Sequence, residues 1–543
     1  MKTGFFQQVA GKSWLPFAAA AGVSLIAAGA VFGAPRSIIR PYLEIQQVAT
    51  ADFDRGEVLT YTGVGGGVDA SVATRRVQAT ISYNYQRRIG WNGRLNDHDV
   101  HTGVAAVHVD AVPGVLALDA GALAARTHAD IRLPVASART IDSAETADVY
   151  SAYAGPTLST HAGPVSVGAS YRLGYVRVDD HSLSGLPAGA PRVDRVSSSI
   201  VHNASASVGM GSGELPFGWT LGAGWVRENQ NRLDAKFDGK YVRADVVVPV
   251  SPTLAVTAGA GYETMKGSQQ DFLRDANGQP VLTANGNLIA DPTRPRLRTV
   301  DLDGEMWDAG IIWRPSERTE LQARGGRRYG GTTFTASLEH RINSRSALSA
   351  SIYDNVSSFG RLMIADLNGL PRKFEIPRNG FGGSGTCIFG TDPGTGACFN
   401  DALQSLTSFN FRNRGANLVY SASHGPVHFG LGASYANRHY LTPRGTGAFP
   451  LEGVTDQSFT LNGNYGRRLS RTSGWDADAY AAFYDSGIAG ADGAFGAGLT
   501  GRYYRNVYGD HLQAQLSAGL YTTQAGDFEA DYGSILVGLR YTF

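Results

Sequence analysis

The last residues of the chain, 533–543, alternate between two kinds of side chain and end on an aromatic residue. Because side chains in a strand point alternately to opposite faces, this pattern predicts a strand with one face in lipid and the other in water. It is typical of the closing strand of a transmembrane β-barrel. The apolar row consists of Ile535, Val537, Leu539, Tyr541 and Phe543. We expect the last three, Leu539, Tyr541 and Phe543, to act as the assembly signal.

The amino-terminal segment has the layout of a secretory signal. Lys2 and Lys12 precede an apolar stretch that ends at Ala28, and small residues follow as far as Ala30. A retained anchor helix is the alternative, but the stretch is shorter than the roughly 20 residues that span a bilayer. We therefore predict a signal peptide over residues 1–30 and a mature barrel over residues 31–543.

Composition narrows the fold class. Hydrophobic residues make up 43% of the chain, yet no apolar run after Ala34 reaches half the length of a membrane-spanning helix. Lys and Arg number 48 against 47 Asp and Glu, so no global charge favours nucleic acid as a partner. Short alternating segments and turn residues fill the chain, with no linker and no helical periodicity of useful length. These features predict one large all-β domain.

The alternating segments carry small or aromatic residues on one face and Gly, Ser, Thr and Asn on the other. Clear examples are residues 77–86, 219–225 and 512–520. A soluble sandwich would instead favour large interdigitating side chains on its apolar faces. The pattern therefore indicates lipid outside and a wet lumen inside.

Counting these segments gives about 22 strands, within a range of 20 to 24. Even-numbered connections are short, as at residues 74–76, whereas odd-numbered connections include all the long ones. The long connections span residues 129–146, 179–194, 266–301, 357–408 and 441–456. Outer-membrane barrels have short periplasmic turns and long external loops, so we expect an antiparallel meander barrel with both ends in the periplasm.

The stretch from Arg40 to Asp52, RPYLEIQQVATAD, is the only local family signature in the chain. With the meandering strands and terminal Phe, it resembles the outer-membrane β-barrel porin group of sphingomonad-type proteobacteria. That group is related to barrels encoded with exopolysaccharide gene clusters. The resemblance implies a porin-like barrel and supplies no catalytic motif.

The expected size of the barrel raises the question of what fills it. Known barrels of about 22 strands are plugged. The energised receptors of this size carry a folded plug before the first strand, and the stretch between Ala30 and Arg40 is too short for one. This favours a channel over an energised receptor.

The connection over residues 357–408 is the best candidate for narrowing the pore. It contains both cysteines of the chain, Cys387 and Cys398, and an exported protein lies in an oxidising compartment, so we expect a disulfide. By chain-entropy reasoning its small loop contributes about 2 to 3 kcal/mol of ordering. The segment either folds inward as a constriction or stands on the cell surface as a protease-resistant hairpin. The segment from Gly267 to Thr299, rich in turn residues, is a second candidate.

The polar face of each strand supplies candidate lumen-facing residues of both charge signs. They are Gln322, Arg324, Glu339, Arg341, Arg243, Asp245, Asp476, Asp478, Arg502 and Arg540. A mixed lumen suits weak ion selectivity or hydroxylated solutes, although the charges could simply pair and solvate the wall. Arg327 and Arg328, at a strand end, are expected to be exposed.

No cluster of a nucleophile, a base and an orienting group is evident, so the chain is not predicted to be an enzyme. We predict no cofactor and no metal centre. Asp97, His98, Asp99 and His101, in an external loop, are the alternative, a candidate site for a surface cation.

Two functions follow. One is a channel for hydrophilic solutes or exopolysaccharide export, and the alternative is a non-conducting surface barrel whose external loops bind a ligand or polysaccharide. The expected partners are outer-membrane lipid and lipopolysaccharide, the barrel-assembly machinery and a polysaccharide-export apparatus. No nucleic acid is expected, and the barrel is expected to be a monomer.

Overall fold

The computed structural model describes residues 36–543 except for 92–94, 129–145, 181–195, 279, 284–286, 376–380, 382–386, 405, 444–450, 489, 491 and 527. The expected signal peptide over residues 1–30 lies outside the described residues. In the part that is described, no helix is long and apolar enough to cross a membrane.

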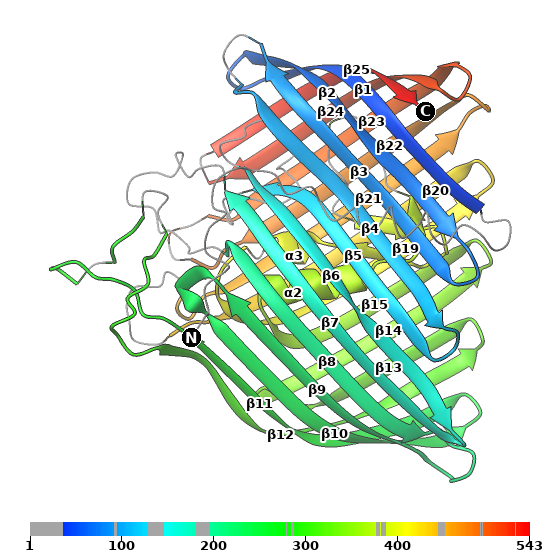
Figure 1. The fold of residues 1–543 in the computed structure, drawn as a ribbon, viewed down its shortest axis with the longest axis vertical. Coiled ribbons are helices and arrows are strands. Elements are labelled where there is room, and N and C mark those ends of the chain that lie inside the picture. The colour runs from blue at the N-terminus through cyan, green and yellow to red at the C-terminus, as the bar shows by residue number, and fades with distance from the viewer. Residues whose placement is uncertain are drawn as a thin grey trace, which may run out of the picture.

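One antiparallel sheet of 22 strands makes up most of the structure. Each strand pairs with its neighbour in the chain, and β1 pairs with β25 from Tyr42 opposite Thr542 to Asp52 opposite Tyr532. The sheet therefore closes into a barrel (Figure 1), and the prediction of an all-β meander of about 22 strands is confirmed. Its strands are β1 (Arg36–Asp52), β2 (Glu57–Ala73), β3 (Val77–Gly90), β4 (His98–Val112), β5 (Leu116–His128), β6 (Thr146–Ala162), β7 (Val165–Asp180), β8 (Ser198–Met210), β9 (Gly218–Gln230), β10 (Lys236–Ser251), β11 (Leu254–Gln269), β12 (Leu297–Ser316), β13 (Thr319–Arg328), β14 (Gly331–Asn343), β15 (Ser346–Ser357), β19 (Asn410–His424), β20 (Val427–Leu441), β21 (Thr455–Arg468), β22 (Ser473–Asp485), β23 (Ala494–Tyr508), β24 (Leu512–Ala525) and β25 (Phe528–Thr542).

The period-two alternation decides which face of each strand meets lipid. In β25, Ile535 and Val537 are 59% and 58% exposed, whereas Leu536 between them is fully buried. Leu43 and Ile45 on β1 are likewise exposed, and Glu44 between them is buried. Exposed large hydrophobic residues thus form the outward rows of these strands in a closed barrel, which is the arrangement that crosses an outer membrane.

Short turns join the strands at one end of the barrel, and the long connections lie at the other end. Gly114 and Gly425 occupy two of the tight turns with φ of 73° and 58°, a left-handed conformation in which any other residue is strained. By the loop-length rule of outer-membrane barrels, the short turns mark the periplasmic end.

A glycine run in β2 lets the barrel close tightly beside β1 and β3. A Cβ on Gly65 would lie 2.0 Å from the carbonyl oxygen of Tyr85, and one on Gly67 would lie 2.1 Å from that of Tyr83. The run pairs with both neighbours without a register shift, so it relieves crowding and is not a bulge.

Two connections contain further structure. Residues 358–409, called the inner segment below, comprise α2 (Phe359–Asn368), β16 (Phe374–Glu375), β17 (Cys387–Gly390), β18 (Gly396–Cys398) and α3 (Asn400–Gln404). Its two helices lie within the barrel (Figure 1). A 3₁₀ turn, η2 (Arg232–Asp234), joins β9 to β10. Between β11 and β12 the described residues form only isolated bridges such as Phe272 with Ala290.

Candidate functional site

Helix α2 packs on the inner face of β5 to β8. Ser358 caps the helix by accepting a hydrogen bond from the Arg361 amide. Phe359 and Met363 are fully buried against Val149 and Val176 of β6 and β7. This apolar cluster fills one side of the lumen, so the interior is not wet throughout, and the inner segment folds inward instead of standing on the cell surface.

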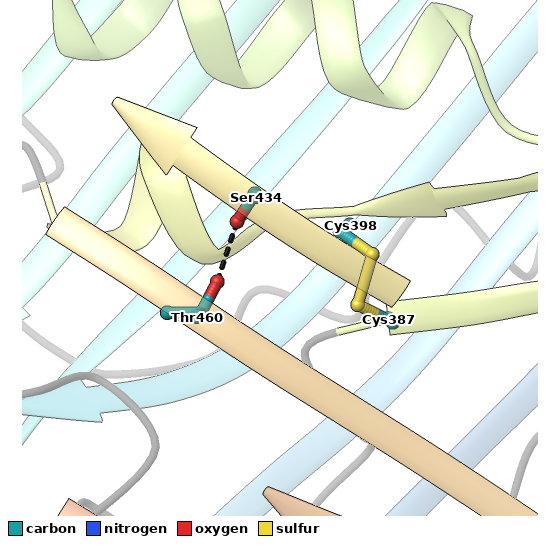
Figure 2. Close-up of a disulfide and its surroundings, with 4 residues drawn as sticks. All are labelled: Cys387, Cys398, Ser434 and Thr460. Carbon is teal, nitrogen blue, oxygen red and sulfur yellow. Dashed lines mark hydrogen bonds between the residues drawn. A yellow bond between two sulfur atoms is a disulfide. The ribbon is translucent and has the colours of Figure 1, made fainter. Parts of the chain in front are cut away.

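The inner segment carries the Cys387 to Cys398 disulfide, which joins the neighbouring strands β17 and β18. Figure 2 shows the disulfide beside β20, the strand that bears Ser434. A Cβ on Gly432 of β20 would lie 2.9 Å from the sulfur of Cys398 and 3.0 Å from that of Cys387. The disulfide hairpin therefore rests directly on the barrel wall.

Replacing Gly432 with Val is expected to push this hairpin off the wall, because the new side chain overlaps both sulfur atoms. Overpacking of this kind costs about 1 to 3 kcal/mol. Proteolysis of the native protein should cut the inner segment faster in the variant. Gly463→Val is the matched control, since a Cβ there has no neighbour closer than 3.9 Å. Equal cleavage of both variants would contradict the contact.

A buried ionic cluster fixes the carboxyl-terminal part of the inner segment. Arg438 donates two hydrogen bonds to Asp456, of 2.8 and 2.9 Å, and a third of 2.9 Å to the carbonyl oxygen of Asp401 in α3. The hydroxyls of Tyr440 and Tyr484 also donate to Asp456, at 2.6 and 3.0 Å. The Arg438 and Asp456 side chains are fully buried. We call these five residues the anchor cluster.

The Asp401 carboxyl is buried and has hydrogen-bond partners from the barrel wall. It accepts hydrogen bonds from Asn413 at 2.7 Å and from Tyr353 at 3.1 Å. Burial raises the pKa of Asp401, and this effect outweighs the opposing influence of Arg438. The carboxyl is therefore a structural contact between α3 and the wall.

The amino-terminal part of the inner segment is fixed by Glu228 of β9. This carboxylate accepts hydrogen bonds from Ser358 and, at 2.6 Å, from Ser199. It also pairs with Arg361 of α2 at 3.3 Å. Arg361 donates to Asn410 at 2.7 Å. Both ends of the inner segment are thus bound to opposite parts of the wall by buried charge pairs.

Sequence reasoning missed these anchors. The chain did carry one signal: Phe359, Met363 and Leu367 recur at the four-residue spacing of a buried helix face. A helix of this length is marginal in isolation, and only the barrel wall makes it stable.

The structure brings together three of the candidate lumen residues with one that was not singled out. Arg243 donates to Asp245 at 2.7 Å and to Asp308 at 2.6 Å. Arg324 donates to the same two carboxylates at 2.6 and 3.2 Å. Arg243, Asp245, Asp308 and Arg324, from β10, β12 and β13, form what we call the lumen quartet. Their side chains are 13 to 27% exposed, so water reaches them.

The other candidates are spread around the wall. Arg502 donates to Asp476 at 2.5 Å, and Arg540 donates to Glu44 at 2.8 Å under the ring of Tyr42. The remaining four occupy the inward rows of their strands without joining the quartet: Gln322, Glu339, Arg341 and Asp478.

The strand end at Arg327 and Arg328 differs from expectation. Arg327 is exposed as predicted, but Arg328 is half-buried and donates to the buried Glu263 at 2.8 Å. The two residues alternate in direction along β13, so only Arg327 points outward.

At the closing strand, Leu539, Tyr541 and Phe543 lie on the outward row and are 45%, 42% and 64% exposed. Within the described residues, no group of three or more His, Cys, Asp or Glu could hold a metal ion. Asp97, His98, Asp99 and His101 make no such group.

Comparison with known proteins finds no matching family model and no matching curated protein. Several solved structures show a distant likeness. The FrpB iron transporter of Neisseria meningitidis (F5-1 variant, apoprotein form) is 10% identical over 92% of this chain and 81% of its own, with a TM-score of 0.42. The ferric-catecholate import receptor Fiu of E. coli K12 (open form) is 11% identical over 92% and 81%, with a TM-score of 0.44. The siderophore receptor PiuA of Acinetobacter baumannii is 10% identical over 92% and 82%, with a TM-score of 0.40.

Structural likeness with TM-scores of 0.40 to 0.44 does not indicate which substance this protein transports. The protein is an outer-membrane β-barrel on the strength of its own closed sheet and apolar outer face.

Proposed function

We propose that the protein is a channel for small hydrophilic solutes, with the inner segment as its constriction and strands β10 to β14 as the lining of the passage. The contrast between two parts of the wall supports this. On β20, every second residue from Gly430 to Tyr440 is buried, whereas β13 and β14 contain no buried residue. Water therefore reaches the inner face of β13 and β14, while the inner segment covers β20.

The charges on the open wall suggest which solutes pass. The lumen quartet contains two arginines and two aspartates that neutralise one another, and Arg314 pairs with Glu320 at 2.9 Å nearby. A balanced wall exerts little net field on ions but offers many donors and acceptors. It suits neutral or zwitterionic solutes rich in hydroxyl or amino groups.

Export of an exopolysaccharide fits less well. A polymer needs a continuous wide path, and the inner segment packs into a large apolar cluster with β5 to β8 and is bound at both ends. The channel proposal is therefore restricted to small solutes.

Removing the negative half of the lumen quartet is expected to make the channel anion-selective. In the double variant Asp245→Asn with Asp308→Asn, Arg243 and Arg324 lose their counter-charges and attract anions to the wall. Reversal potentials across a planar bilayer with a salt gradient should shift toward that of chloride. Asp301→Asn with Asp303→Asn is the matched control, because these residues lie on the outward row of β12.

An unshifted reversal potential in the quartet variant would place the passage elsewhere. Absence of any conductance, in the wild-type protein and again after reduction or cleavage of the inner segment, would refute the channel. It would favour the surface barrel.

A further inference from the structure

Exposed arginines gather on two neighbouring turns at the periplasmic end. Arg467 and Arg468 end β21, Arg471 lies in the turn before β22, and Arg505 lies near the end of β23. All four side chains are exposed. The turn before β22 touches the last part of β23, because the amide of Asn506 in β23 donates to the carbonyl oxygen of Thr472 at 2.7 Å. Four guanidinium groups therefore share one part of the rim.

Their charge is not balanced locally. Within the described residues, none of these four arginines forms an ion pair with a carboxylate, in contrast to the arginines of the lumen quartet and the anchor cluster. Two acids in the same region have other partners: Asp476 binds Arg502, and Asp510 accepts a hydrogen bond from Asn506 at 3.3 Å. The turns thus present a net positive surface.

Two of these arginines lie on the lipid-facing row beside aromatic rings. Arg467 and Tyr503 are the register partners of Trp475 on its two sides, and Arg505 pairs with Ser473 on the same row. The rings of Tyr465 and Trp475 stand 4.9 Å apart, and Tyr503 is exposed on the outer face. Aromatic side chains at the ends of barrel strands sit at the depth of the lipid headgroups. Arg467 lies beside these rings and Arg505 lies two residues beyond Tyr503, so both guanidinium groups can reach the level of the lipid phosphates.

We propose that Arg467, Arg471 and Arg505 bind the phosphate of an anionic phospholipid in the inner leaflet of the outer membrane. Guanidinium groups pair with phosphate oxygens through two parallel hydrogen bonds, and the rings of Tyr465, Trp475 and Tyr503 pack against the lipid below its headgroup. The position of Arg467 and Arg505 on the outward row selects a lipid over a free anion, because that row faces the bilayer and not the lumen. The site is independent of conduction.

Lipid retention by the purified full-length protein tests this site. The protein is exchanged into detergent micelles that contain phosphatidylethanolamine alone, or with phosphatidylglycerol or cardiolipin, and bound lipid is measured by native mass spectrometry. We expect the wild-type protein to retain the anionic lipids. The triple variant Arg467→Gln, Arg471→Gln, Arg505→Gln should retain several-fold less.

The matched control removes the same number of exposed arginines toward the external end, by Arg87→Gln, Arg298→Gln and Arg327→Gln, and should retain lipid like the wild type. Heat-modifiable gel migration verifies that each barrel is folded. Equal retention by the triple variant, or equal retention of phosphatidylethanolamine and anionic lipid, would overturn the proposal. Displacement of the lipid by inorganic phosphate at similar concentration would overturn the lipid as ligand and leave a simple anion site.

Discussion

Excision of residues 359–407 is expected to raise the single-channel conductance several-fold. Ser357 and Phe411 are register partners on the adjacent strands β15 and β19, so a short Gly-Ser link can join the cut ends without disturbing the barrel. Conductance increases with open cross-section, and barrels of this size have a wide lumen once the filling element is gone. Single-channel recording in planar bilayers gives the measurement.

The matched control removes residues 274–288, which lie between β11 and β12 and form only isolated bridges where they are described. Its conductance should equal that of the wild type. Heat-modifiable migration on a gel verifies that both shortened barrels are closed. If the 359–407 excision gives a closed barrel with unchanged conductance, the inner segment is not the constriction.

The architecture of the barrel follows from the alternation of apolar and polar residues, which is visible in the sequence itself. A period of two assigns Ile535 and Val537 to lipid and Arg540 to the interior without knowledge of any contact. The lengths of the connections then set the orientation. Both signals are local, which is why strand number and face could be predicted from the chain alone.

The contacts inside the lumen depend on register and could not be read in this way. Arg243 and Asp308 are 65 residues apart in the sequence. They meet only because Gly261 of β11 is the register partner of Arg243 on one side, and Gly259, two residues earlier, is that of Asp308 on the other. Burial of the disulfide under Gly432 likewise requires the inner segment to be in place. Sequence placed candidate charges on the inner face and left their partners undetermined.

Replacing Arg438 with Met is expected to release the carboxyl-terminal part of the inner segment. The substitution leaves Asp456 and Asp401 buried without their cation, and breaking a buried pair from one side costs about 3 to 5 kcal/mol. Because α3 is held to the barrel wall through Asp401, the substitution weakens the contact between the inner segment and the wall. Limited proteolysis should cut the inner segment much faster, and bilayer currents should show transitions to larger conductance.

Two further variants separate this effect from a general loss of stability. Arg177→Met removes an arginine from an exposed pair with Asp179, and such pairs contribute about 1 kcal/mol at most, so its cleavage should match the wild type. Combining Arg438→Met with Asp456→Leu removes both members of the buried pair and should restore part of the protection, because no carboxylate then remains unpaired on β21. Protection equal to the wild type in Arg438→Met alone would mean that the packing of α2 on β5 to β8, and not the anchor cluster, holds the inner segment in the lumen.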